Sequence, residues 1–124
     1  QVGGETSASE DEGLLQKYLG DLKAVLAMRT AGKFDQALFD TYNGSMVQLS
    51  DEHIREMYQA FMLVYVDEAD DDTYERLGLT DVDIDDTVIG FCEMMSIKLG
   101  ELMDQPRHVR VQALANETAR KAEA

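Results

Sequence analysis

Several residue types that would narrow the function of this chain are scarce. Its 124 residues include one cysteine, one proline, no tryptophan and two histidines. A single cysteine, Cys92, excludes an internal disulfide, and no basic neighbour lowers its pKa, so we expect a buried structural thiol. The lack of disulfides fits the cytoplasm or another reducing compartment. No apolar run approaches the ~20 residues that a membrane span needs.

Patterns of known catalytic and metal sites are missing as well. His53 and His108 have no second His or Cys at metal-ligand spacing. No glycine-rich phosphate loop and no nucleophile elbow occurs. The sequence does not decide whether the chain is an enzyme. It favours a non-catalytic role without a cofactor.

Positive charge is also scarce. Eleven Lys and Arg stand against 25 Asp and Glu, which gives a net charge of −14. Such a surface repels nucleic acids and anionic membranes, so we expect neither as a direct partner. It suits a basic protein, a cation or a high-salt cytoplasm. Residues 105–124 carry a net +2, and this basic tail is expected to dock on the acidic remainder.

Helical periodicity is the strongest pattern present. Between residues 80 and 104, apolar residues recur at helical spacing and cover most of the circumference. A helix of this kind is typical of the buried centre of a bundle. Thr80 and Asp83 form its expected N-terminal cap, and Pro106 follows its end.

Other helices are expected around this central one. Their ranges are 9–32, 33–42, 50–66 and 107–121, with a short helical turn at 73–77. Ser9 and Ser50 are expected N-caps, and Asn43-Gly44 is expected to form a turn. The prediction is an all-α, soluble single domain of about five helices over residues 9–124, after a disordered tail at 1–8.

The run Ala31-Gly32-Lys33-Phe34-Asp35-Gln36-Ala37 resembles the turn of a tetratricopeptide repeat. In that family a glycine and an aromatic residue join two antiparallel helices, and a small alanine lets them approach. The resemblance covers one helix pair, and no second copy follows at the ~34-residue period. The run therefore predicts an ordinary helical hairpin with Phe34 inward.

Two groups of acidic residues are candidates for metal sites. Asp81, Asp83 and Asp85 match the first positions of a calcium-binding EF-hand loop, but Asp86 replaces the required glycine and Cys92 the required glutamate. Helix capping explains these aspartates better.

Magnesium is the second metal hypothesis. The pairs Glu68/Asp71 and Glu101/Asp104 have the i, i+3 spacing that puts two carboxylates on one helix face. All-α nucleotide pyrophosphatases use comparable pairs. However, no cluster of basic residues accompanies these pairs to bind phosphate. A solvated charge run is the simpler explanation.

Binding to another protein is the function that we expect. Met28, Met94 and Ile97 lie off the main apolar faces of their helices, where they can meet a partner, a further helix or a second copy. With an acidic rim they suit a basic or amphipathic segment. The residues expected to contact it are Met28, Asp67, Glu68, Asp70, Asp71, Asp72, Met94 and Ile97.

The sequence thus predicts an acidic adaptor or chaperone-like factor, and self-association stays open. Two alternatives belong to other classes. One is a nucleic-acid mimic that occupies a DNA-binding protein with its carboxylates, and the other is a magnesium-dependent pyrophosphatase. Adaptation to high salt would explain the acidity without any partner.

Overall fold

Six helices make up the described part of the chain, residues 8–123 of a computed structural model, and no strand occurs in this range. They are α1 (Ala8–Thr30), α2 (Gln36–Val47), α3 (Asp51–Tyr65), α4 (Asp71–Leu77), α5 (Asp86–Leu102) and α6 (Arg107–Glu123). The all-α prediction is confirmed. The helix count is six because the expected short turn is a separate helix, α4. The expected tail at 1–8 lies outside the described residues, apart from Ala8. Since Ala8 already belongs to α1, the prediction of Ser9 as its N-cap was wrong.

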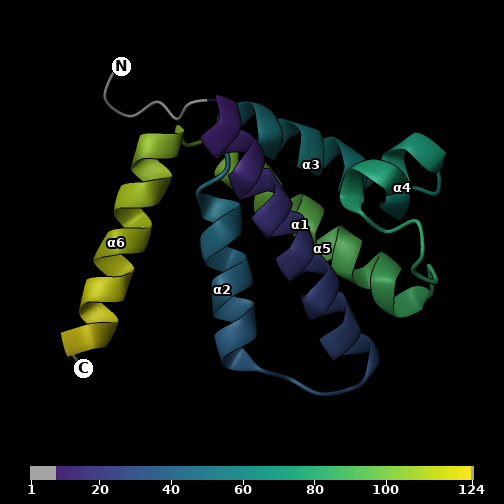
Figure 1. The fold of residues 1–124 in the computed structure, drawn as a ribbon, viewed down its shortest axis with the longest axis horizontal. Coiled ribbons are helices and arrows are strands. Elements are labelled where there is room, and N and C mark those ends of the chain that lie inside the picture. The colour runs from purple at the N-terminus through teal and green to yellow at the C-terminus, as the bar shows by residue number, and fades with distance from the viewer. Residues whose placement is uncertain (1–7, 124) are drawn as a thin grey trace.

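The helices pack as two antiparallel pairs with two additions (Figure 1). Helices α1 and α2 form a hairpin, and α3 packs along α5. Helix α4 lies at the end of α3, whereas α6 lies at the opposite side of the molecule and packs against α2. The basic helix and the acidic α4 region are therefore far apart.

Tyrosine hydroxyls link three helices inside the core. The hydroxyls of Tyr18 and Tyr42 lie 2.8 Å apart, and the Tyr42 hydroxyl donates to the sulfur of Met95 over 2.9 Å. Burial raises the pKa of both tyrosines above the ordinary value. The two buried hydroxyls remain neutral and satisfy one another's hydrogen-bonding needs. Their directional contacts link the three helices within an otherwise apolar core.

Side-chain caps set the starts of four helices, α2 to α5. Ser50 accepts from the amide of His53 over 3.1 Å, which confirms it as the N-cap of α3. Asp85 caps α5 by accepting from Val88 over 3.0 Å. The prediction of Thr80 as this cap was wrong. The aspartate-rich stretch before Asp85 has weak helix propensity and stays non-helical.

Helix ends use the left-handed conformation. Gly32 and Gly78 have φ values of 71° and 70° just after α1 and α4, a conformation that glycine adopts readily at helix ends. Asp67, with φ 62°, takes the same position after α3. The amide of Glu68 there donates to the carbonyl of Leu63 over 2.9 Å, which closes the turn.

Helix α2 differs from its prediction at both ends. It begins at Gln36 and continues through Asn43-Gly44, so the expected turn is wrong. Burial of Met46 and Val47, beyond that dipeptide, favours the helical path over the local turn preference. Phe34, expected inward, is 63% exposed in the connection between α1 and α2.

Helix α5 is buried on one face only. Val88, Phe91 and Leu99 are almost fully buried, but Ile97 is 60% exposed and Met94 39% exposed. The structure therefore does not show a helix enclosed on all sides. It shows a core helix with a free outer face.

Helix α6 is attached through a buried arginine. The guanidinium of Arg110 donates to the carbonyls of Val47 and Leu49, at the end of α2, and to the carboxylate of Asp51. Ala115 and Ala122, further along α6, are exposed. The basic tail thus docks mainly on carbonyl oxygens rather than on the acidic run.

Candidate functional site

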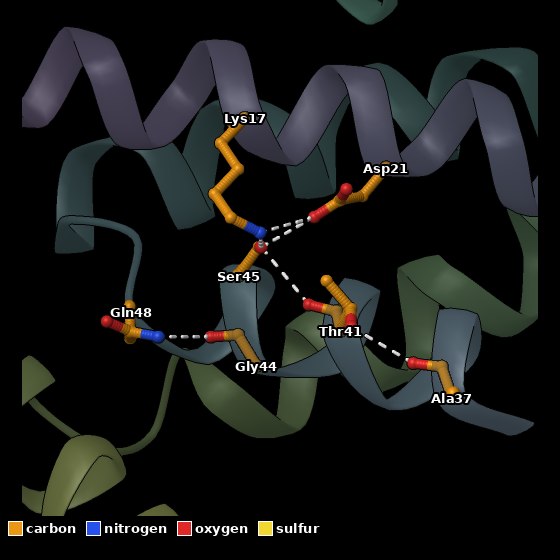
Figure 2. A network of polar contacts seen from close by, with 7 residues as sticks. All are labelled: Lys17, Asp21, Ala37, Thr41, Gly44, Ser45 and Gln48. Atoms are coloured by element: carbon orange, nitrogen blue, oxygen red, sulfur yellow. Dashed lines mark hydrogen bonds and ion pairs between the residues drawn. The ribbon is translucent and has the colours of Figure 1, made fainter.

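A polar network joins α1 to α2 (Figure 2). The ammonium of Lys17 lies 3.0 Å from both Asp21 Oδ2 and Ser45 Oγ, and Ser45 Oγ donates to Asp21 over 2.7 Å. Ser45 Oγ also lies 3.1 Å from the Thr41 carbonyl. A serine next to a lysine can act as a nucleophile, so its exposure decides the role.

Burial makes this network a structural link. Ser45 is 3% exposed, so a substrate cannot approach its oxygen, whereas the Lys17 side chain is 54% exposed. A nucleophilic pair needs the reverse, with the serine accessible and the lysine desolvated. The three side chains tie α1 to α2 across the hairpin.

The cysteine and the two histidines lie on three different helices, α5, α3 and α6. Cys92 is buried, as expected, and burial raises the pKa of its thiol to about 12. His53 Nδ1 lies 3.6 Å from Asp11 Oδ1, between the starts of α3 and α1. His108 is exposed on α6.

Several residues of the acidic run at 67–72 take part in local contacts at the end of α3 and the start of α4. Asp67 closes the end of α3, and Asp70 caps α4 by accepting from the amide and hydroxyl of Thr73 over 2.9 and 2.8 Å. These hydrogen bonds hold the pKa of Asp70 below its usual value. Asp72 pairs with Arg76 at 2.6 Å. The side chains of Asp67, Glu68 and Asp71 are exposed and form no ion pair within residues 8–123.

The calcium candidates do not converge on a common point. Asp81 pairs with Lys23 at 2.8 Å, and Asp85 caps α5. The hydrogen bond and charge of Lys23 lower the pKa of Asp81. The ion pair with Lys23 explains Asp81, and capping of α5 explains Asp85.

The two magnesium pairs are likewise separate. Glu68 and Asp71 lie beside α4, whereas Glu101 and Asp104 lie at the far end of α5, near the start of α6 (Figure 1). Across residues 8–123, no three His, Cys, Asp or Glu side chains are grouped closely enough to hold a metal ion.

Met28, another expected contact residue, has a partner inside the chain. It is half-buried, and its sulfur accepts from the amide of Asp35 over 2.9 Å. Met28 therefore stabilises the connection between α1 and α2. It is also distant in sequence from the acidic run at 67–72.

The outer face of α5 brings Met94 and Ile97 together. Ile97 lies four residues after Glu93 and four before Glu101, which places all three side chains on one helix face, with Met94 beside them. Glu93 also forms a hydrogen bond with Tyr65 of α3, which raises the pKa of that tyrosine. We call Tyr65, Glu93, Met94, Ile97 and Glu101 the α5 outer face.

This face lies in the most acidic part of the chain. From Asp67 to Asp104 the sequence has 13 acidic residues and two basic ones, Arg76 and Lys98. Arg76 is neutralised by Asp72, and Lys98 is half-buried in a hollow towards α6. The α5 outer face therefore belongs to a segment whose charge is almost entirely negative.

A hollow of about 290 Å³ lies between α4 and the stretch that leads to α5. Its lining consists of Asp71, Tyr74, Leu79, Thr80, Val82 and Ile84. The sequence did not indicate it, because Val82 and Ile84 were expected inside a helix that does not form there. A second, more polar depression lies between α2 and α6.

Comparison with known proteins finds no match, either to a family model, to a curated protein or to a solved structure. Among the described residues, no helix has the length and apolar character to cross a membrane.

Proposed function

We propose that the chain is a non-catalytic protein-binding module that takes up a basic amphipathic segment on the α5 outer face. The observation that carries this proposal is Ile97, an isoleucine 60% exposed between Glu93 and Glu101. An exposed apolar side chain with an acidic rim complements a helix with apolar residues on one side and Lys or Arg beside them.

Met94 and Tyr65 extend this surface. Methionine adapts its shape to different apolar partners, and tyrosine offers a rigid ring with a polar end. The negative charge around them would speed association with a basic partner and orient it. These properties support an adaptor or chaperone-like role.

The test is a titration of isotope-labelled protein with three helical peptides of about 18 residues, five turns each. One carries leucine on one side and lysine on the other, the second replaces lysine by glutamate, and the third shuffles the first. We expect only the first to bind, with amide shifts centred on residues 93–101. Equal binding of the glutamate peptide, or shifts confined to α6, would rule the proposal out.

Binding of the shuffled lysine peptide with equal affinity would favour the nucleic-acid mimic instead. A mimic recognises positive charge without an apolar stripe, and its affinity depends steeply on salt. The observation that favours a nucleic-acid mimic is the set of 13 acidic residues from Asp67 to Asp104.

A further inference from the structure

The hollow between α4 and the stretch before α5 suits a single side chain. Its volume of about 290 Å³ lies at the lower limit of pockets that enclose a drug-sized ligand. Leu79 forms a buried wall, while Tyr74, Val82 and Ile84 are half-buried and leave apolar surface accessible. An aliphatic chain can therefore gain contact there.

The polar edge of the hollow favours a positively charged side chain. Asp71 lines it, and its exposed carboxylate has no ion pair among the described residues, in contrast to Asp72, which is bound to Arg76. Asp83 adds a carboxylate in the same connecting stretch, where Asp81 is paired with Lys23 and Asp85 caps α5. A cation is favoured here, and an anion is repelled.

We propose that this hollow binds one arginine side chain of the basic segment that the chain takes up. The propyl part of arginine would lie on Val82 and Ile84, and the guanidinium would meet Asp71 and the ring of Tyr74. Guanidinium is planar and weakly hydrated, so it stacks on aromatic rings and pairs with carboxylates more readily than an ammonium group. This inference deepens the proposed function and rests on it for the source of the arginine.

The test uses small probes and the whole chain. Methyl-labelled protein is titrated with butylguanidinium, n-butylammonium, 1-pentanol and pentanoate, and the methyl signals of Leu79, Val82 and Ile84 are followed. We expect butylguanidinium to bind most tightly and pentanoate not to bind. Equal affinity for 1-pentanol or n-butylammonium would overturn the assignment to arginine.

Three variants make the result specific. Asp71→Asn should weaken butylguanidinium about twofold to fivefold, the range expected of an exposed ion pair. Glu75→Gln removes one charge from the same helix outside the hollow and should leave the affinity unchanged. Tyr74→Leu should weaken butylguanidinium more than 1-pentanol. Equal effects of Asp71→Asn and Glu75→Gln would contradict the proposal.

The probes separate this inference from the proposed function. If the lysine–leucine peptide binds the α5 outer face but butylguanidinium does not shift the three methyl groups, only the arginine site is lost. If the probe binds and no peptide does, the hollow stands and the binding-module proposal falls.

Discussion

At the residue scale, Arg110 shows how a charged side chain can hold an element in place. Its side chain is almost fully buried and donates to carbonyls at the end of α2, to the carbonyl of Gln105 and to Asp51. Carbonyls at a helix C-terminus carry partial negative charge and have no partner within the helix. A guanidinium supplies several donors in one plane, which a lysine cannot.

Replacing Arg110 should therefore cost stability. We expect Arg110→Met to lower the free energy of unfolding by about 3 kcal/mol, because it leaves buried acceptors without a donor. Urea unfolding followed by circular dichroism measures this. Arg120→Met, an exposed position on the same helix, should stay within about 0.5 kcal/mol. Similar losses in both variants would contradict the role of Arg110.

Asp70 should contribute to acid sensitivity. Its folded-state pKa is lowered below 3.8 by the Thr73 hydrogen bonds, so the ionised form stabilises the fold above that pH. This contribution is lost as the pH falls through the lowered folded value. Asp70→Asn retains a capping oxygen but does not titrate, so we expect a shallower loss of stability below about pH 4. Identical urea midpoints against pH for both proteins would refute this.

At the element scale, the helices differ in how firmly they are held. Helix α3 packs along α5 over much of its length, with Ile54 and Phe61 fully buried. Helix α6 is fixed near Arg110 and half-buried at Leu114, and every residue from Ala115 to Glu123 is exposed. Local opening should therefore be easiest in the second half of α6.

Hydrogen exchange measures this difference directly. We expect amide protection to be greatest in the centres of α3 and α5 and to decline along α6 after Leu114, because exposed helical turns open without unfolding the core. Uniform protection across α6, equal to that of α3, would indicate a contact that the structure does not contain.

The sequence predicted elements better than their ends. Apolar spacing located the helices expected at 9–32, 50–66 and 107–121, and Ser50 marked the start of α3. These signals are local, since they depend on side chains within one or two turns. The continuation of α2 past Asn43-Gly44 and the buried Arg110 depend on contacts with other helices, so periodicity did not reveal them.

In the candidate site, too, the sequence predicted local features but not those that depend on contacts between elements. Met94 and Ile97 lay off the apolar stripe and are exposed, as their spacing indicated. The roles of Asp70 in capping and of Asp72 in pairing follow from where α4 begins, which the sequence placed two residues later. The hollow beside α4 requires the non-helical stretch before Asp85.

At the scale of the whole molecule, charge is unevenly distributed. The net charge is −14, and most of it comes from the part that contains α4 and α5. The basic helix α6 lies on the other side, against α2 (Figure 1). Repulsion among neighbouring carboxylates destabilises the free protein, and a basic partner would relieve it.

Salt should therefore stabilise the free chain. Raising NaCl from about 20 to 500 mM shortens the screening length several-fold, so we expect the melting temperature to rise by about 2–5 °C. Differential scanning calorimetry at constant pH gives the answer. A melting temperature that falls with salt would mean that attractive ion pairs, such as Lys23–Asp81, outweigh the repulsion.

The most direct test of the central claim is the affinity of the lysine–leucine peptide for two matched variants. Ile97→Ser removes the exposed side chain at the centre of the α5 outer face, and Val109→Ser removes one that is 41% exposed on α6. Burial of an isoleucine predicts that Ile97→Ser binds about tenfold more weakly, with Val109→Ser unchanged. Equal affinities for the two variants would contradict binding at the α5 outer face.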